Sequence, residues 1–183
     1  MFRAIIFAVV DCGYSPRSAL ELVDSGDIRL HKIENLIESS KYGIHDLSNM
    51  DLDKDSKLPR FNMPLELGIF LGAKRYGDKT QKKKRILVLD KERYRYQKSI
   101  SDISGQDIKS HGGKEERAIK CIRDWLQTAS RRTTLPGARH ITNRYRGFEK
   151  ELPVICATLK LDVDDLTFND LWETIVAWQK ENV

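Results

Sequence analysis

The sequence predicts an α/β protein in which a doubly wound parallel sheet is followed by a C-terminal helical appendage. Residues 4–10 and 85–90 are continuously apolar runs, as strands buried on both faces of a parallel sheet are. A third run, 42–47, has strand length and follows an amphipathic segment. Segments whose apolar residues have helical spacing lie between these runs, and strands that alternate with helices are typical of a doubly wound sheet.

The first predicted strand is Ala4–Val10, and it ends at Asp11. It is too short for the apolar region of a secretion signal, and an aspartate follows it at once. A helix is expected over Ser15–Asp24, because Pro16 suits a first helical turn and Ser25–Gly26 would close it.

The middle of the chain supplies the rest of the predicted sheet. Residues 30–38 form an amphipathic helix and lead into the strand Tyr42–Leu47. A long polar loop from Ser48 to Phe61 then precedes a helix from Pro64 to about Tyr76, and such a loop is suited to act as a lid. The last strand is Arg85–Asp90.

Residues after Asp90 are predominantly helical in pattern. An apolar stripe predicts a helix over 114–129, and residues 133–137 form a linker. Two further helices are expected near 148–159 and 168–181, which gives an α/β domain over 1–132 and a helical appendage over 138–183. The apolar face of the last helix would either cover the sheet domain or form a dimer.

Composition limits the classes of protein and partner. The chain has 183 residues, of which 40% are hydrophobic and 32% are charged, and it has no apolar run of about 20 residues. We therefore expect a cytoplasmic globular protein without a membrane partner. Its three scattered cysteines predict neither a disulfide framework nor a metal site. The net charge is +5, but the basic run 79–85 lacks aromatic residues that stack on bases, so a solvated loop is favoured over a nucleic-acid contact.

The strongest candidate for chemistry is Glu66, a lone carboxylate in the apolar run 61–72. With Asn62 or Met63 as the helix cap, Glu66 would lie in the first turn or so, where the helix dipole favours a carboxylate and where α/β folds face a ligand crevice. Its apolar neighbours predict partial desolvation and a raised pKa. The alternative is an exposed carboxylate that serves only the helix dipole.

Polar residues at strand ends and before this helix are candidates for substrate binding. Asp11, Asp46 and Ser48 would line the crevice at the carboxyl ends of the strands. Asn62 would orient a ribose or the carboxylate, or only cap the helix. Arg60 would bind a phosphate or be solvated.

Other polar residues are weaker candidates. One glycine, Gly13, does not make a dinucleotide fingerprint, and the chain has no phosphate-binding P-loop motif. Cys12 has no histidine or aspartate partner at a suitable spacing. The polar cluster 101–108 with His111 would either close over the site or pack the helical appendage. His45 is expected to be a core or interface histidine whose ring nitrogens have hydrogen-bond partners.

Three segments resemble the group that contains TIR domains and nucleoside 2-deoxyribosyltransferases. They are Ile37-Glu38-Ser39-Ser40, Tyr42-Gly43-Ile44-His45-Asp46-Leu47-Ser48 and Asn62-Met63-Pro64-Leu65-Glu66-Leu67-Gly68. The resemblance covers about residues 1–125 and is greatest to bacterial TIR-like proteins, several of which act in antiphage defence. It implies a flavodoxin-like three-layer fold, with a further strand expected at Asp27–Leu30.

The resemblance also implies a reaction, cleavage of an N-glycosidic bond in a nucleotide. Glu66 would be the catalytic glutamate, and Asp11, Ser48 and Asn62 would line the pocket. We expect a glycohydrolase that cleaves the nicotinamide–ribose bond of NAD, with NAD as substrate and no separate cofactor, and with activity that depends on self-association or a signalling partner. The alternatives are a non-catalytic module that binds a nucleotide or a protein, and an enzyme similar to the deoxyribosyltransferases.

Overall fold

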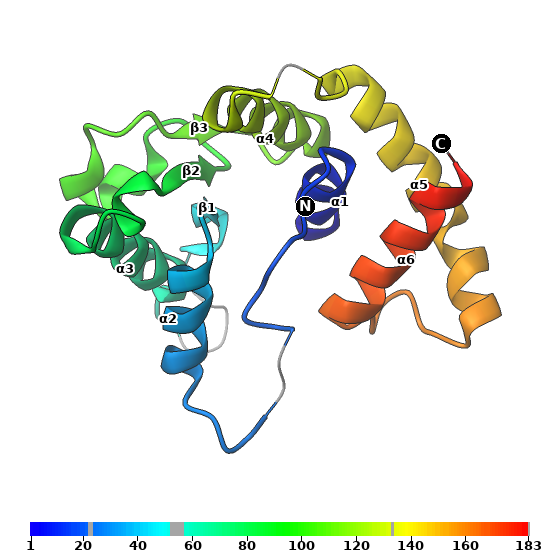
Figure 1. The fold of residues 1–183 in the computed structure, drawn as a ribbon, viewed down its shortest axis with the longest axis horizontal. Coiled ribbons are helices and arrows are strands. Elements are labelled where there is room, and N and C mark those ends of the chain that lie inside the picture. The colour runs from blue at the N-terminus through cyan, green and yellow to red at the C-terminus, as the bar shows by residue number, and fades with distance from the viewer. Residues whose placement is uncertain (22–23, 52–56, 133, 183) are drawn as a thin grey trace. The chain divides into compact units, whose positions relative to one another are not determined.

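The computed structural model describes residues 1–21, 24–51, 57–132 and 134–182 and divides into two compact units. Residues 25–113 form one, the sheet unit, and residues 1–24 with 114–183 form the other, the helical unit. Figure 1 labels their helices and strands. The chain is therefore an α/β protein, as predicted.

The sheet unit contains a three-stranded parallel sheet within its described residues, in the order β1-β2-β3. Asp46 pairs with Leu89, and Leu89 pairs in turn with Lys109. The carboxyl ends of the strands therefore share one edge. In chain order the elements are α2 (Arg29–Ser39), β1 (Tyr42–Asp46), the short 3-10 helix η1 (Leu47–Asn49), α3 (Asn62–Tyr76), η2 (Gln81–Lys83), β2 (Arg85–Asp90), η3 (Arg95–Lys98), η4 (Ser101–Ile103) and β3 (Lys109–Ser110).

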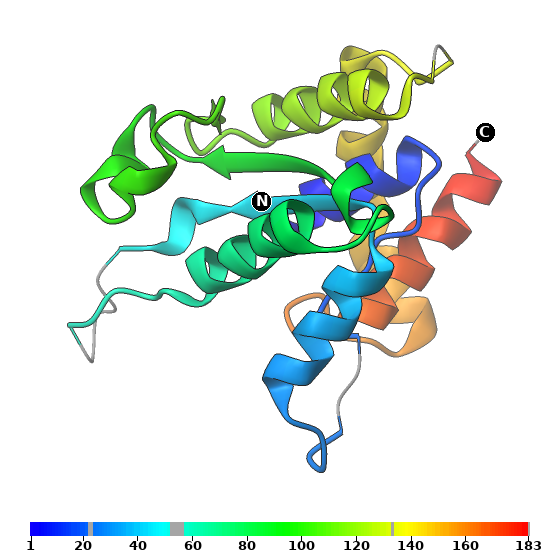
Figure 2. The ribbon, with the colours of Figure 1, turned by 60° about the vertical axis from the view of Figure 1, so that its left-hand side comes forward.

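Helix α3 packs against β1 and against α2, as Figure 2 shows. The contact with β1 is close at Gly43, where an added Cβ would lie 2.7 Å from a ring carbon of Phe70. The Phe70 ring also meets the His45 ring edge-on, with centroids 5.4 Å apart. Bulky side chains at position 43 would separate α3 from the strand. One hydrophobic cluster of buried residues in this unit consists of Leu47, Met50, Leu67, Val88 and Tyr96.

The helical unit is built around its first helix, which packs against the other three. Phe7 lies at its centre with 0% exposure, and its ring centroid is 5.5 Å from Tyr145, 5.5 Å from Phe148 and 5.8 Å from Trp178. The unit contains α1 (Phe2–Asp11), α4 (Glu115–Ser130), α5 (Ala138–Leu159) and α6 (Phe168–Glu181).

The prediction of a strand at Ala4–Val10 is wrong, because these residues belong to α1. A short apolar run does not by itself distinguish a buried strand from a buried helix. Here the buried residues Ala4, Phe7 and Ala8 recur with helical spacing, and they face the other helices of the unit. The tertiary contacts of this run therefore select the helix.

Two further expectations near the N-terminus are also wrong. Residues 15–21 of the predicted helix Ser15–Asp24 are not helical, and residues 22–23 lie outside the described part of the chain. The strand expected at Asp27–Leu30 is absent, because helix α2 begins at Arg29. The compact units also differ from the predicted division into 1–132 and 138–183, because α1 and α4 pack with α5 and α6.

The remaining elements agree with the sequence. The amphipathic segment 30–38 is part of α2, and the strands at 42–47 and 85–90 correspond to β1 and β2. Helices α4 and α6 correspond to the patterns over 114–129 and 168–181, whereas α5 begins at Ala138, before the expected 148. The apolar face of α6 packs against α1 and α5 within the helical unit, whereas the sequence left it to cover the sheet domain or to form a dimer. Among the helices of the described ranges, none has the length and apolar character needed to cross a bilayer.

Candidate functional site

The carboxyl edge of the sheet unit brings Asp46 and Ser48 together. Asp46 ends β1, and Ser48 lies in η1, the single turn that follows. The backbone N–H and the hydroxyl of Ser48 both donate to Asp46 Oδ1, at 3.0 and 2.5 Å. These bonds hold the first turn after the strand and fix the Ser48 hydroxyl at the sheet edge.

His111, the residue that follows β3, joins this pair. Its Nε2 lies 2.9 Å from Ser48 Oγ and 3.4 Å from Asp46 Oδ1. The backbone N–H of Gly113 donates to Nδ1 at 3.1 Å, so the neutral ring carries its proton on Nε2 and donates from there. Burial alone would raise the pKa of Asp46, but hydrogen bonds from His111 and Ser48 hold that pKa below the usual aspartate value.

This arrangement can bind a hydroxyl group, but it is not a nucleophilic relay. In a serine–histidine–aspartate relay the histidine accepts the serine proton and the aspartate supports its other nitrogen. Here the ring nitrogen nearest Ser48 is a donor, and Asp46 contacts Ser48 and the same side of the ring. The cluster therefore presents a fixed hydroxyl and a carboxylate, the pair of groups that suits a sugar hydroxyl.

A second polar network lies at the end of β2. Arg95 donates from Nε and Nη2 to Asp90 Oδ1, at 2.9 and 2.7 Å, and from Nη2 to the carbonyl of Leu47 at 2.6 Å. Its Nη1 donates to Asp51 at 2.7 Å, and Lys91 donates to the other oxygen of Asp51 at 2.6 Å. Asp90 is fully buried, so Arg95 supplies the charge that its carboxylate requires.

Glu66 is half-buried on α3, and burial raises the pKa of its carboxyl, partly offset by the positive charge of Arg29. The raised pKa agrees with the desolvation expected from its apolar neighbours. Among the residues that the structure describes, Glu66 has no hydrogen-bond or ion-pair partner. It is therefore a partly desolvated carboxylate that is available to a ligand.

The start of α3 differs from the prediction. The helix includes Asn62 as its first residue, with Phe61 in the cap position and no side-chain cap, so Asn62 is not the cap. Pro64 is therefore in the first turn, where its missing N–H is not needed, and Glu66 is one residue beyond that turn. The dipole contributes less at that position than the sequence suggested. Asn62 and Arg60 are both exposed.

Asp11 lies in the helical unit, at the end of α1 rather than at the end of a strand. Its Oδ1 accepts from Arg144 at 2.9 Å and from Gln179 at 3.0 Å. Burial raises the pKa of Asp11, and Arg144 opposes that rise. The prediction that Asp11 ends a strand and lines a crevice there is therefore wrong, because its carboxylate joins α1 to α5 and α6.

The structure thus brings together only part of the predicted site. Asp46 and Ser48 meet, as expected, and no hydrogen bond or ion pair within the described ranges joins them to Glu66. Sequence reasoning missed His111 as a partner of Ser48 and missed Arg95 altogether. The sequence offered one signal for His111: it accompanies the polar cluster 101–108, for which closure over the site was one of two expectations. Residues 52–56 of the predicted lid loop lie outside the described residues.

Cys12 is not activated as a nucleophile. Burial raises the pKa of the Cys12 thiol to about 11, so the thiolate is scarce at neutral pH. In the parts of the chain that are described, no three histidine, cysteine or acidic side chains form a group that could hold a metal ion.

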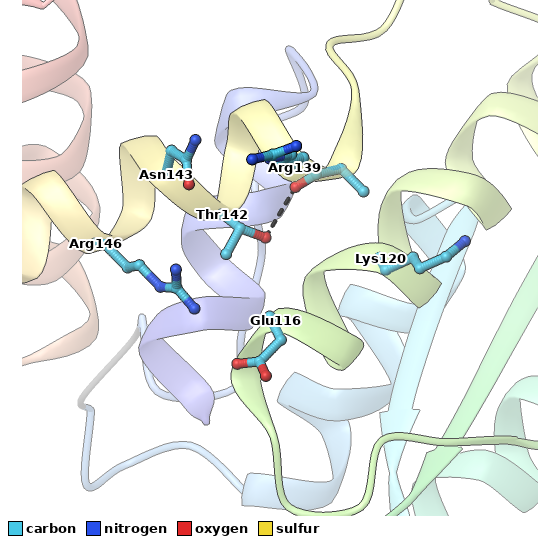
Figure 3. Close-up of a pocket in the computed structure, with 7 residues that line it drawn as sticks. Glu116, Lys120, Arg139, Thr142, Asn143 and Arg146 are labelled. Atoms are coloured by element: carbon cyan, nitrogen blue, oxygen red, sulfur yellow. Dashed lines mark hydrogen bonds between the residues drawn. The ribbon is translucent and has the colours of Figure 1, made fainter.

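A shallow depression of about 370 Å³ lies between α4 and α5 in the helical unit (Figure 3). Its walls mix Glu116 with the cations Lys120, Arg139 and Arg146, and the hydroxyl of Thr142 donates to a backbone carbonyl at 2.8 Å. It therefore lacks the apolar walls of a small-molecule site.

His45 differs from the expectation of a satisfied core histidine. Its ring is 5% exposed, and neither ring nitrogen has a hydrogen-bond partner in the described part of the chain. Burial lowers the pKa of His45 to about 4. The ring is therefore neutral at physiological pH and packs on Phe70 as an apolar group.

This burial predicts an acid-sensitive sheet unit. The folded pKa of about 4 lies below the ordinary value of 6.5, so the unfolded chain binds the additional proton and stability falls as pH drops from 6.5 to 4. The loss attributable to His45 is at most about 3 kcal/mol. Chemical denaturation of wild type and His45→Leu across this range should give a shallower pH dependence for the variant. Parallel curves would contradict this assignment.

No protein-family model, curated protein or solved structure matches the chain.

Proposed function

We propose that this protein is a TIR-like nucleotide glycohydrolase that cleaves the nicotinamide–ribose bond of NAD, with Glu66 as its catalytic carboxylate. One observation carries the proposal: a half-buried glutamate without a hydrogen-bond partner among the described residues lies on the helix that follows the first strand of a parallel sheet. The flavodoxin-like arrangement implied by the sequence resemblance is part of the same proposal.

The chemistry needs one carboxylate. When the nicotinamide–ribose bond of NAD breaks, nicotinamide leaves as a neutral molecule, so no acid has to protonate it. The sugar carbon becomes positively charged, and a nearby carboxylate stabilises that charge. A water molecule then forms the new C–O bond at this carbon and releases a proton to solvent. The burial that raises the pKa of Glu66 also strengthens its attraction to a cation, because the surroundings screen charge less than water does.

The hydroxyl-binding cluster supports the same class of ligand. Ser48 and His111 are held at the strand ends by hydrogen bonds to each other and to Asp46. In α/β sheets, ligands bind outside the carboxyl ends of the strands. We infer that Ser48 contacts a ribose hydroxyl and that Asp46 orients Ser48. Asn62 and Arg60, exposed near the start of α3, remain candidates for contacts to the rest of the nucleotide.

The expected result of replacing Glu66 with glutamine is a loss of nicotinamide release by about 100-fold or more, because the amide cannot stabilise the sugar cation. The measurement is chromatographic detection of nicotinamide after incubation with NAD over a wide range of protein concentrations, since activity is expected to depend on self-association. Glu34→Gln, at an exposed carboxylate on α2, is the matched control and should keep full activity. Equal release by Glu66→Gln and wild type would overturn the assignment of the residue.

A non-catalytic nucleotide-binding module is the second candidate. It is favoured by the absence, among the described residues, of a hydrogen bond or ion pair between Glu66 and the Asp46–Ser48–His111 cluster. Binding of NAD without nicotinamide release at any protein concentration would support this module and exclude the glycohydrolase.

A further inference from the structure

Two cations at the end of β2 converge on one exposed carboxylate. Arg95 Nη1 lies 2.7 Å from Asp51 Oδ1, and Lys91 Nζ lies 2.6 Å from Asp51 Oδ2. A carboxylate held by an arginine and a lysine on its two oxygens has the shape and charge of part of a phosphate group. The two cations therefore already form the contacts that a phosphate would need.

Arg95 is fixed in place before any ligand binds. Its side chain is 90% buried, and its Nε and Nη2 are occupied by Asp90 and by the carbonyl of Leu47. Tyr94, the preceding residue, has a left-handed backbone with φ of 64°, which turns the chain into η3. The remaining nitrogen, Nη1, faces Asp51. A rigid guanidinium loses little freedom when it binds an anion.

Asp51 is bound in a way that allows replacement. Its side chain is 59% exposed, and exposed ion pairs contribute little to stability because water competes for both charges. Hydrogen bonding from Lys91, with the charge of Arg95, holds the pKa of Asp51 below the usual value, so the carboxylate is ionised at neutral pH. The Asp51 carboxylate thus occupies the position that a more highly charged anion, such as a phosphate, would take.

We propose that Arg95 and Lys91 form a binding site for the phosphate or diphosphate group of a nucleotide, and that Asp51 occupies this site until the nucleotide displaces it. The identity of the ligand as a nucleotide rests on the proposed function; the anion site itself does not.

The anion site contacts the turn that contains Ser48. The carbonyl of Leu47 accepts from Arg95, and Leu47 stands between Asp46 and Ser48. A ligand that places a ribose hydroxyl at Ser48 therefore has a binding site for its phosphate nearby. This juxtaposition favours a nucleotide over a sugar without phosphate.

The charges agree with this assignment. Arg95 is balanced by buried Asp90, and Lys91 is balanced by Asp51. When Asp51 is displaced, the two cations face the ligand with one uncompensated positive charge. Asp46 is close along the chain, but its carboxylate is held by Ser48 and His111.

The test is calorimetric titration of inorganic pyrophosphate into the full chain, two test variants and two control variants. Asp51→Asn removes the competing charge and should raise the affinity about fivefold or more. Lys91→Met removes one cation and should lower the affinity about tenfold. Asp107→Asn and Lys109→Met alter a comparable exposed ion pair, 2.6 Å long, and should leave the affinity unchanged. Equal affinity in wild type, Asp51→Asn and Lys91→Met would overturn the proposal.

The source of the phosphate is tested separately. ADP should bind more tightly than pyrophosphate, and adenosine should not compete with pyrophosphate; weaker binding of ADP would overturn the assignment to a nucleotide. Both titrations are repeated with Glu66→Gln, which should bind pyrophosphate as wild type does. If wild type releases nicotinamide but the Asp51 and Lys91 variants bind pyrophosphate as wild type does, the anion site is wrong and the glycohydrolase stands. If these variants change pyrophosphate affinity as expected but no nicotinamide is released, the glycohydrolase is wrong and the anion site stands.

Discussion

Replacing Phe7 with alanine is expected to lower the free energy of unfolding of the helical unit by about 3–5 kcal/mol. The Phe7 ring is fully buried, with three aromatic rings within 5.8 Å between centroids. Its removal would leave a cavity where α1 meets α5 and α6, and such a densely packed cluster closes only partly around a cavity. The effect is large because α1 contacts every other helix of the unit.

Tryptophan fluorescence during urea unfolding measures this effect. All three tryptophans, Trp125, Trp172 and Trp178, belong to the helical unit. Phe2→Ala is the matched control, because Phe2 is on the same helix but is 46% exposed, and it should cause a much smaller loss. Equal losses for the two variants would contradict the packing of α1 in this core.

The second large effect is expected at Arg95. Replacing it with methionine leaves Asp90, which is fully buried, without the cation that balances its charge. Removal of one member of a buried ion pair costs about 3–5 kcal/mol, because the remaining charge stays desolvated. The hydrogen bond to the carbonyl of Leu47 is lost as well. We expect the loss of stability to be concentrated in β2 and in the turn after β1.

Hydrogen exchange of the amides of β1 and β2 measures this loss, because the sheet unit has no tryptophan. Lys91→Met, which removes an exposed cation from the same network, should cost less than about 1 kcal/mol. The double variant Asp90→Asn/Arg95→Met should be more stable than Arg95→Met alone, since the buried charge is then absent. If the double variant and Arg95→Met have similar stabilities, the uncompensated charge of Asp90 is not the cause of the stability loss.

Much of the architecture could be predicted from local patterns. The amphipathic segment 30–38 and the stripe over 114–129 have a period that only a helix satisfies. The continuous apolar run 85–90 has no period, and it is a strand as predicted. The continuous run 4–10 has no such period, and its interpretation as a strand was wrong. The candidate site shows the same difference between local and long-range features. Asp46 and Ser48 are two residues apart and were predicted together, whereas His111 is 63 residues from Ser48 and was not predicted as its partner.

The sequence by itself indicated the α/β class and the unusual position of Glu66 in an apolar run, because the patterns of the single elements depend on residues close together in the chain. The alternation of these elements predicted a parallel sheet, and the tertiary structure decided which strands pair. Only the tertiary structure decided that residues 2–11 form the central helix of a helical unit and that Asp11 binds Arg144. It also decided that Ser48 meets His111 and that Arg95 joins Asp90 to Asp51. Burial and long-range contacts fix these features, and neither quantity is encoded in local periodicity.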